Sequence, residues 1–160
     1  MTTPDRRSFI PEPHELQPLK GKLAVITGTS RGIGAEIAVS LAGVGVDIVG
    51  SHVDPKKEAK QEDTSTRVVV QGASFDSIIA DISEEKGREA LLQVAIGGTQ
   101  KPRGVDYLIL NAAGGLERGR SEDWAEQINI KAQHELVKGF VPNMNPGGKI
   151  IFMTSLWAHR

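Results

Sequence analysis

A glycine-rich segment near the start of the chain combines residue types and a spacing that bind phosphate. Residues 27–34 read Thr-Gly-Thr-Ser-Arg-Gly-Ile-Gly and place Gly28, Gly32 and Gly34 in a G-x-x-x-G-x-G pattern. Glycines allow a tight turn, and a following helix N-terminus offers unpaired N–H groups and a positive partial charge. Such a turn between a strand and a helix accepts a pyrophosphate. The other residues of the predicted phosphate-binding turn are Ser30, Arg31 and Ile33.

The same residues admit a second chemical interpretation. Gly28 to Gly32 also fits G-x-S-x-G, the nucleophile elbow of α/β-hydrolases, in which Ser30 would be the nucleophile. That fold places its elbow after several strands, whereas a single apolar run precedes Ser30, and His134 and His159 lack a supporting acid in fitting order. A purely structural glycine turn is the third interpretation. We favour phosphate binding.

Short apolar runs predict the strands that must position this turn. Each run has four or five residues, and the first is rich in β-branched side chains, which suits a strand buried on both faces. Helical patterns lie between the runs, and strands that alternate with helices indicate a parallel sheet with helices on both faces. The runs cover residues 23–27, 46–49, 77–80, 107–110 and 149–153.

The segments between these runs carry helix signals. Apolar residues recur at helical spacing over residues 33–42, and two glycines then end that helix. Ser83 is predicted to cap the helix that follows the third strand, with two glutamates in its first turn. We further expect a surface helix or loop over residues 54–66, an inserted strand over 67–70, one long helix over 121–141 and a turn over 143–148.

The composition limits the class of protein. The 160 residues include 18 Gly and no Cys, so disulfides, Cys-ligated metals and Cys nucleophiles are excluded. A formal net charge of −1 argues against nucleic acid as the main partner. No apolar run approaches the roughly 20 residues of a membrane span, and the N-terminus has no apolar signal region. We expect a soluble, cytoplasmic protein without a membrane partner or a metal.

Five segments, taken in chain order and at fitting distances, carry a family resemblance. They are Thr27–Gly34, Asp81-Ile82, Asn111-Ala112-Ala113-Gly114, Ile128-Asn129-Ile130 and Gly147–Ser155. Together they resemble the cofactor loop, the adenine-contacting Asp, the N-A-G segment, the active-site Asn and the serine-ending fifth strand of the classical short-chain dehydrogenase/reductase family. The resemblance extends from about residue 20 to residue 159.

The resemblance implies a fold and a set of site residues. The fold is a Rossmann-like, doubly wound α/β sheet with strand order 3-2-1-4-5. By resemblance, Ser155 orients the substrate oxygen and stabilises its developing charge, while Asn129 holds a water in the proton relay. Local roles stay open: a place just before a helix cap for Asp81, tying of strands for Asn111, polar packing for Asn129 and a backbone bond for Ser155. The implied cofactor-binding residues beyond the glycine turn are Asp81, Ile82, Asn111, Ala112, Ala113 and Gly114.

The same resemblance implies an NAD(P)-dependent oxidoreductase that moves hydride between a nicotinamide and a small carbonyl or alcohol substrate. The position after the second strand that selects NAD when acidic falls at His52, and Asp54 remains a candidate for that role. Arg31 stands in the glycine turn, where a guanidinium can pair with a 2′-phosphate. We therefore favour NADP over NAD. The family also implies a homo-oligomer, either a dimer or a tetramer.

The sequence departs from the family pattern at its end. Five residues follow Ser155, so the family's Tyr-x-x-x-Lys proton donor is absent, and Tyr107, the only tyrosine, lies inside an apolar run. We expect the N-terminal part of a reductase, without its C-terminal strands and lid and inactive alone. The alternative is a non-catalytic dinucleotide-binding or regulatory protein. Residues 1–20, with four prolines, are expected to form an arm, and residues 21–160 one incomplete dinucleotide-binding domain.

Overall fold

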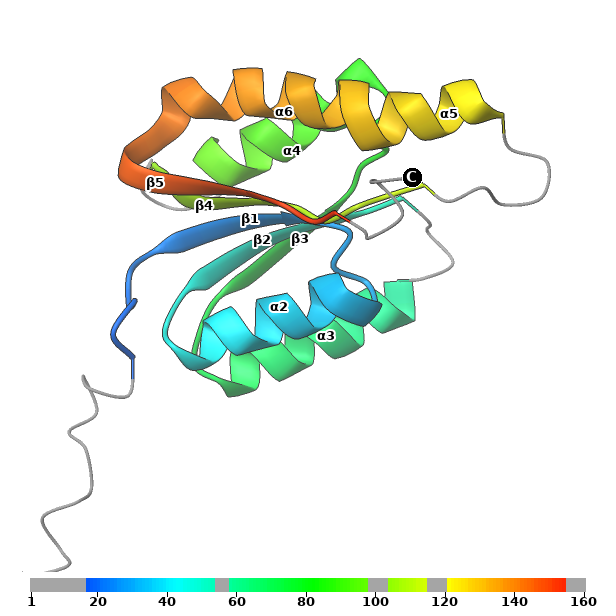
Figure 1. Ribbon diagram of the computed structural model, residues 1–160. Coiled ribbons are helices and arrows are strands. Elements are labelled where there is room, and N and C mark those ends of the chain that lie inside the picture. Colours follow the sequence, from blue (N-terminus) through cyan, green and yellow to red (C-terminus); the bar gives the residue numbers. More distant parts are fainter. Residues whose placement is uncertain (1–16, 54–57, 98–103, 115–120, 155–160) are drawn as a thin grey trace, which may run out of the picture.

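The computed structural model describes residues 17–53, 58–97, 104–114 and 121–154, which form a five-stranded sheet flanked by helices (Figure 1). Most of the predicted arm lies outside these residues. The strands are β1 (Leu23–Thr27), β2 (Asp47–His52), β3 (Phe75–Ile79), β4 (Val105–Leu110) and β5 (Met144–Phe152). The α-helices are α2 (Gly32–Gly43), α3 (Glu58–Val70), α4 (Glu85–Gly97), α5 (Glu122–Glu126) and α6 (Gln133–Phe140).

The sheet has the topology that the alternating pattern predicts. Neighbouring strands are all parallel and follow the order β3-β2-β1-β4-β5, which confirms the Rossmann-like expectation. Parallel strands need crossover connections, so α2 and α3 cover one face while α4, α5 and α6 cover the other (Figure 1). The carboxyl ends of all five strands therefore meet at one edge, where ligands of such sheets bind.

β1 is the central strand, and its sequence explains its place. Its four apolar residues are fully buried. Leu23 and Val25 belong to the core on the α4 and α6 side, whereas Ala24 and Ile26 belong to the core on the α2 and α3 side. A strand covered on both faces needs apolar residues at every position rather than at alternate ones. β1 is thereby held rigidly beneath the glycine turn that follows it.

The expectation of an inserted strand over residues 67–70 is wrong, because these residues form the last turn of α3. The buried side chains Gln61, Thr64 and Val68 recur at helical spacing, and Val68 packs into the core beneath α2. The two valines that follow Val68 are exposed. Burial of one helical face therefore outweighs the β propensity of a valine run, which depends strongly on context.

The long helix expected over residues 121–141 is divided into segments. α5 passes into a π-helix (Gln127–Ala132), then into α6, and the chain ends this run with a 3-10 turn that contains Pro142. Ser121 begins the run as an N-cap, and its hydroxyl accepts from the Trp124 N–H at 3.2 Å. A single π turn inside an α-helix is frequently found at a functional site. The break in the helix therefore lies where a functional site is expected.

The turn expected over residues 143–148 is wrong as well. β5 already begins at Met144, which pairs with Val105 of β4. The register then shifts before Lys149 pairs with Tyr107, so the extra residues form an irregular stretch within the strand. Glycine and proline in this stretch resemble turn residues in sequence, but they also mark bulges at strand ends.

A buried carboxylate joins three strands at the amino edge of the sheet. Asp106 accepts from the Leu23 N–H at 2.9 Å, from Lys22 Nζ at 2.9 Å and from Asn145 Nδ2 at 3.0 Å. Asn145 also donates to the Gly104 carbonyl at 3.1 Å. Burial alone would raise the pKa of Asp106, but the hydrogen bonds and the Lys22 charge outweigh it and hold the pKa below its ordinary value. This clamp lies opposite the edge where ligands are expected.

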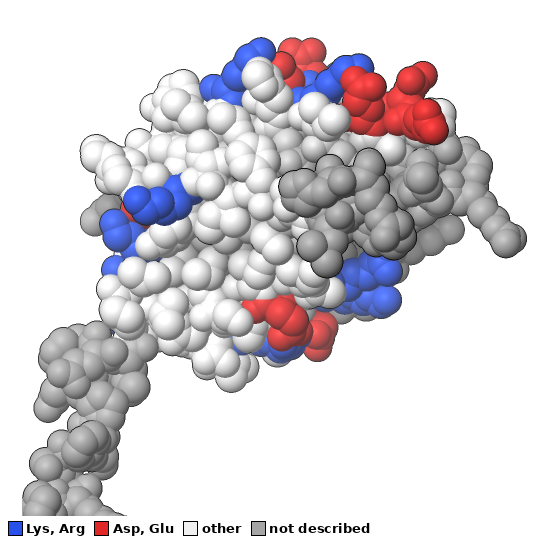
Figure 2. Space-filling view, viewed as in Figure 1, with Lys and Arg blue, Asp and Glu red and all other residues white. Residues whose placement is uncertain are grey.

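β5 forms one edge of the sheet, and apolar side chains are exposed around it. Ile151 and Phe152 are 42% and 50% exposed, and Ile130 on the neighbouring π-helix is 63% exposed. Figure 2 shows the same face, where charged side chains gather over the helices and the band between them carries few. Such a charge-poor, apolar surface is typical of a contact surface. No helix in the described part of the chain is long and apolar enough to cross a membrane.

Candidate functional site

The glycine turn leads from the carboxyl end of β1 into α2, as the pattern predicts. Gly28 and Gly32 have φ of +77° and +62°, a region that other residues rarely adopt. Arg31 is extended at the N-cap position, and its side chain makes no capping hydrogen bond to α2. Because no N-cap side chain accepts from the first N–H groups of the helix, these groups are available to an anion. The residues brought together here are Ser30, Arg31, Gly32, Ile33 and Gly34.

The first two N–H groups of the turn are already engaged. The Gly28 and Thr29 N–H groups donate to the Ser51 carbonyl at the end of β2, at 2.8 and 3.0 Å. These bonds fasten the turn to the neighbouring strand. The N–H groups of the residues that follow, from Ser30 onward, are therefore the ones in position to receive a phosphate.

Gly34 is needed because backbone approaches it closely. An added Cβ would overlap the Gly28 carbonyl oxygen and would lie 2.5 Å from Asn111 Nδ2. The same Asn111 amide donates to the Thr27 carbonyl at 3.0 Å and to the Gly28 carbonyl at 3.2 Å. The start of α2 is thus pressed against both the glycine turn and the end of β4. This contact places the helix N-terminus directly at the carboxyl edge of the sheet.

Asn111 and Ala112 tie β4 to β1. Their N–H groups donate to the Thr27 hydroxyl at 3.0 and 2.9 Å, beside the amide bonds just described. Asn111 thus joins two neighbouring strands, which is one of the roles that the sequence left open for it. The segment that continues to Ala113 and Gly114 lies next to the glycine turn, so the predicted cofactor residues of both strands share one site. A cofactor contact for this segment remains a prediction.

Asn129 forms a reciprocal amide pair with the backbone of Gly114. Asn129 Oδ1 accepts from the Gly114 N–H at 2.9 Å, and Asn129 Nδ2 donates to the Gly114 carbonyl at 2.9 Å. Asn129 lies in the middle of the π-helix, whose wider turn shifts the backbone there relative to an ordinary α-helix. Gly114 is buried beneath Trp124, and an added Cβ would lie 2.5 Å from the Trp124 ring. The pair therefore fixes the loop after β4 against the helix.

We expect Asn129→Ala to lower the free energy of unfolding by about 1–2 kcal/mol, because both backbone groups of Gly114 lose their partner. Urea unfolding followed by far-ultraviolet circular dichroism measures the change. Asn143→Ala is the matched control, since Asn143 makes a single bond to the Gly139 carbonyl at 3.1 Å. Equal losses in the two variants would contradict the special importance of the reciprocal pair.

Asp81 follows β3 at the same edge, and its carboxylate closes a local turn. Asp81 Oδ1 accepts from the Ser83 N–H at 2.9 Å and from the Ser83 hydroxyl at 2.6 Å. The expectation that Ser83 caps the next helix is wrong in detail, because its hydroxyl bonds back to Asp81 and α4 begins two residues later. Asp81 is exposed, whereas Ile82 is buried in the core. Adenine contact for both residues stays a prediction.

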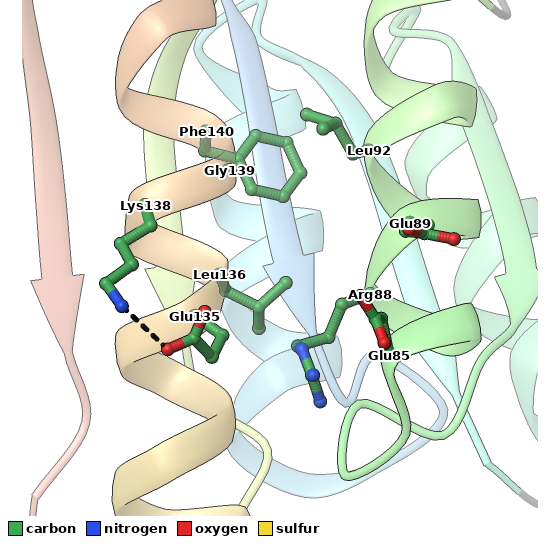
Figure 3. Close-up of a pocket in the computed structure, with 9 residues that line it drawn as sticks. All are labelled: Glu85, Arg88, Glu89, Leu92, Glu135, Leu136, Lys138, Gly139 and Phe140. Atoms are coloured by element: carbon green, nitrogen blue, oxygen red, sulfur yellow. Dashed lines mark hydrogen bonds and ion pairs between the residues drawn. The ribbon is translucent and has the colours of Figure 1, made fainter.

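A hollow of about 310 Å³ lies between α4 and α6. In Figure 3 the side chains of Leu92, Leu136 and Phe140 point into the space between the two helices. Arg88 at its end donates to the Ile82 carbonyl at 2.8 Å and to the Ser83 carbonyl at 3.0 Å. Arg88 thereby fixes the backbone of the two residues that follow Asp81.

Two of the remaining predicted positions, His52 and Arg31, lie within the described residues. His52 is the last residue of β2 and is 6% exposed, so its side chain is largely packed inside the fold. Arg31 is exposed at the N-cap position of α2. Asp54 and Ser155 lie outside the described residues, and the roles assigned to them remain predictions.

A cavity of about 950 Å³ opens beside the turn at the carboxyl ends of β4 and β5. Asn129 lines it and is partly exposed there, so its amide can reach a molecule in the cavity. The wall is mostly apolar, which suits a flat ring or a small organic substrate. The other lining residues are Ile33, Asn111, Ala113, Ile130, Gln133, His134, Val137, Phe152, Met153 and Thr154.

Sequence reasoning missed two supporting residues of the site. Thr27 accepts two backbone bonds from the loop after β4, and Gln61 of α3 bonds the Thr29 hydroxyl of the turn. Thr27 is part of the glycine-rich pattern, so the sequence indicated its position but not its hydrogen-bond partners. Gln61 lies in a polar helix, and no sequence signal distinguishes it from solvent-exposed neighbours.

Comparison with known proteins agrees with this geometry. Residues 22–160 match the model of the family described as short chain dehydrogenase. The chain is 34% identical over 149 residues to the 2-dehydro-3-deoxy-D-gluconate 5-dehydrogenase of Dickeya dadantii, covering 86% of this chain and 55% of that protein. It is 29% identical over 152 residues to pig (Sus scrofa) dehydrogenase/reductase SDR family member 4, covering 89% of this chain and 52% of that protein.

Solved structures give the same result. A blue fluorescent protein from a metagenomic library, in complex with NADPH, has a TM-score of 0.78 and 30% identity, covering 90% of this chain and 60% of that one. A Serratia marcescens short-chain dehydrogenase/reductase has a TM-score of 0.78 and 28% identity, covering 89% and 59%. The chain thus spans little more than half the length of these relatives. The family match over residues 22–160, on a fold and a glycine turn of the expected form, shows that the chain belongs to the short-chain dehydrogenase family.

Proposed function

We propose that the chain binds NADP(H) along the carboxyl edge of its sheet, as the cofactor-binding part of an oxidoreductase. The observation that carries the proposal is the glycine turn at the start of α2, where Arg31 leaves the helix N-terminus without a side-chain cap and Gly34 lets backbone approach closely. Both features fit a dinucleotide pyrophosphate. The similarity to a protein whose structure contains NADPH supports the same ligand.

The proposed roles follow from position. The N–H groups from Ser30 to Gly34 hold the pyrophosphate, and Asp81 with Ile82 contacts the adenine at the end of β3. The residues after β4, from Asn111 to Gly114, line the path toward the cavity. The bound cofactor supplies or accepts a hydride, and the reaction partner is a small carbonyl or alcohol compound. Asn129 reaches the cavity while it also holds Gly114.

Within the same proposal, Ser155 orients the substrate oxygen and Asn129 holds a water for proton transfer. Asn129 Oδ1 and Nδ2 each keep one further lone pair or hydrogen after pairing with Gly114, which leaves capacity for that water. We further propose that the protein acts as a cytoplasmic homo-oligomer. The second candidate function is a non-catalytic dinucleotide-binding or regulatory module, and it would be supported by a native protein that binds NADPH and does not oxidise it.

We expect NADPH to bind this chain more tightly than NADH, and Arg31→Ala to weaken NADPH binding about tenfold. A guanidinium that pairs with the 2′-phosphate makes a charge-assisted hydrogen bond, for which a loss of about 1.4 kcal/mol is modest. NADH lacks that phosphate, so its affinity changes little. Fluorescence titration with both cofactors measures the dissociation constants.

Arg67→Ala is the matched control, because Arg67 is also exposed but pairs with Glu36 at 2.8 Å on the helices. It should leave both dissociation constants unchanged. Equal affinity for the two cofactors, or tighter binding of NADH by the unaltered chain, would contradict the preference for NADP. Absence of binding for either cofactor would contradict the proposed function as a whole.

A further inference from the structure

We propose that Gln61 is a positioning residue that holds the phosphate-binding turn through the hydroxyl of Thr29. Gln61 lies in the first turns of α3, 32 residues along the chain from Thr29. The inference rests on the proposed function, because it concerns how the turn is kept in place for its ligand.

The two side chains form a buried polar pair. Gln61 is 3% exposed and Thr29 is fully buried. Gln61 Nε2 donates to Thr29 Oγ1 at 2.9 Å, and Gln61 Oε1 lies within hydrogen-bond distance of the same hydroxyl at 3.2 Å. Buried polar groups are costly when they lose their partners. The pair therefore links α3 firmly to the turn.

The Thr29 hydroxyl is also packed against β2. On the strand side lies Gly50, where an added Cβ would overlap Thr29 Oγ1. The Ser51 carbonyl already accepts two N–H groups at 2.8 and 3.0 Å, whereas Thr29 Oγ1 is 3.5 Å from it. Since a carbonyl oxygen offers two lone pairs, Gln61 is the main partner of the hydroxyl.

The position of this pair connects it to cofactor binding. Thr29 immediately precedes Ser30, the first turn residue whose N–H group we assign to the pyrophosphate. Binding groups need support that fixes them to within about 0.5 Å, which packed and hydrogen-bonded neighbours provide. Gln61 also lines a hollow of about 610 Å³ together with His52, at the end of β2. Gln61 thus contacts the proposed phosphate-binding turn and also lines the hollow at His52, the position whose residue type is expected to select between the two cofactors.

The test measures coupling between the two residues in NADPH binding. Thr29→Val and Gln61→Met remove the hydrogen bond while preserving much of the side-chain shape, and Thr29→Ser keeps the hydroxyl. The full 160-residue chain is titrated with NADPH by fluorescence, and urea midpoints are measured without cofactor. The matched control is Gln71→Met, an exposed glutamine just beyond α3. Gln61→Asn, whose shorter amide does not reach Thr29, replaces Gln61→Met if that variant fails to fold.

Each single variant should raise the dissociation constant of NADPH about tenfold. The double variant should raise it by about the same factor, because the second change removes a partner that is already lost. Thr29→Ser and Gln71→Met should stay within about twofold of the unaltered chain. Fully multiplicative effects in the double variant would overturn the inference. So would unchanged dissociation constants with lowered urea midpoints, since the pair would then serve stability alone. An unaltered chain that does not bind NADPH refutes the proposed function first, and this inference with it.

Discussion

Replacing Gly34 with alanine should abolish measurable NADPH binding and lower the free energy of unfolding by about 3 kcal/mol. The added Cβ would overlap the Gly28 carbonyl oxygen and crowd Asn111 Nδ2. Both contacts are with groups fixed by other bonds, so the start of α2 must move away from the turn. Insertion of a methyl group into such packing costs roughly 1–3 kcal/mol, and a displaced helix N-terminus no longer meets the phosphate. Fluorescence titration and urea unfolding measure the two effects.

Gly97→Ala provides the control for this substitution. Gly97 ends α4 and has open space where a Cβ would stand, without a positive φ. Alanine favours a helix over glycine by up to about 1 kcal/mol, so this variant should be equally or slightly more stable. NADPH binding should not change. If Gly34→Ala behaved like Gly97→Ala, the close packing of α2 against the glycine turn would not exist in solution.

Replacing Asp106 with alanine should lower the free energy of unfolding by about 3 kcal/mol at pH 7. The carboxylate accepts from the buried Leu23 N–H and from Asn145 Nδ2, and its side chain is 7% exposed. Loss of a buried ionic partner leaves its donors unsatisfied. Glu135→Ala is the control, because its ion pair with Lys138 at 2.9 Å is exposed and should contribute little.

Asp106 should also make the free energy of unfolding depend on pH. The pKa of Asp106 lies below its ordinary value in the folded chain, so the unfolded chain takes up the proton first as pH falls. The contribution of Asp106 is therefore complete above the ordinary carboxyl pKa of about 3.9 and disappears as pH falls through the lowered value. Urea midpoints between pH 7 and pH 2 should fall less steeply in Asp106→Asn. Parallel pH curves for the two proteins would contradict this assignment.

Much of the fold could be read from local patterns. β1 is an uninterrupted apolar run followed by a glycine turn, and both features report a strand that is buried on two faces and ends beneath a helix. The order of strands was available only through the family resemblance, because apolar periodicity does not specify neighbours. Residues 67–70 form a helix although three consecutive valines favour a strand, because tertiary packing buries Gln61, Thr64 and Val68 on one face of α3.

The site could be located from the sequence, but its support could not. Glycine spacing pointed to the phosphate-binding turn, and Asn129 stood in a recognisable segment. The π-helix around Asn129 and its pairing with Gly114 depend on how a helix meets a loop 15 residues earlier, for which no local pattern exists. The bond between Gln61 and Thr29 joins two side chains of common types across 32 residues. Long-range polar contacts of this kind are decided by tertiary geometry.

The central position of β1 also determines how long one of its edges stays unpaired during synthesis. β1 leaves the ribosome well before its partner β4, since Leu23 and Asp106 are 83 residues apart. At about 5–20 residues per second, one hydrogen-bonding edge of this mostly apolar strand waits roughly 4–17 s for its neighbour. During that interval β1 can pair with β2 alone, and an open apolar edge invites other chains. The strand that becomes the most protected in the finished sheet is thus the one longest at risk while the chain is being made.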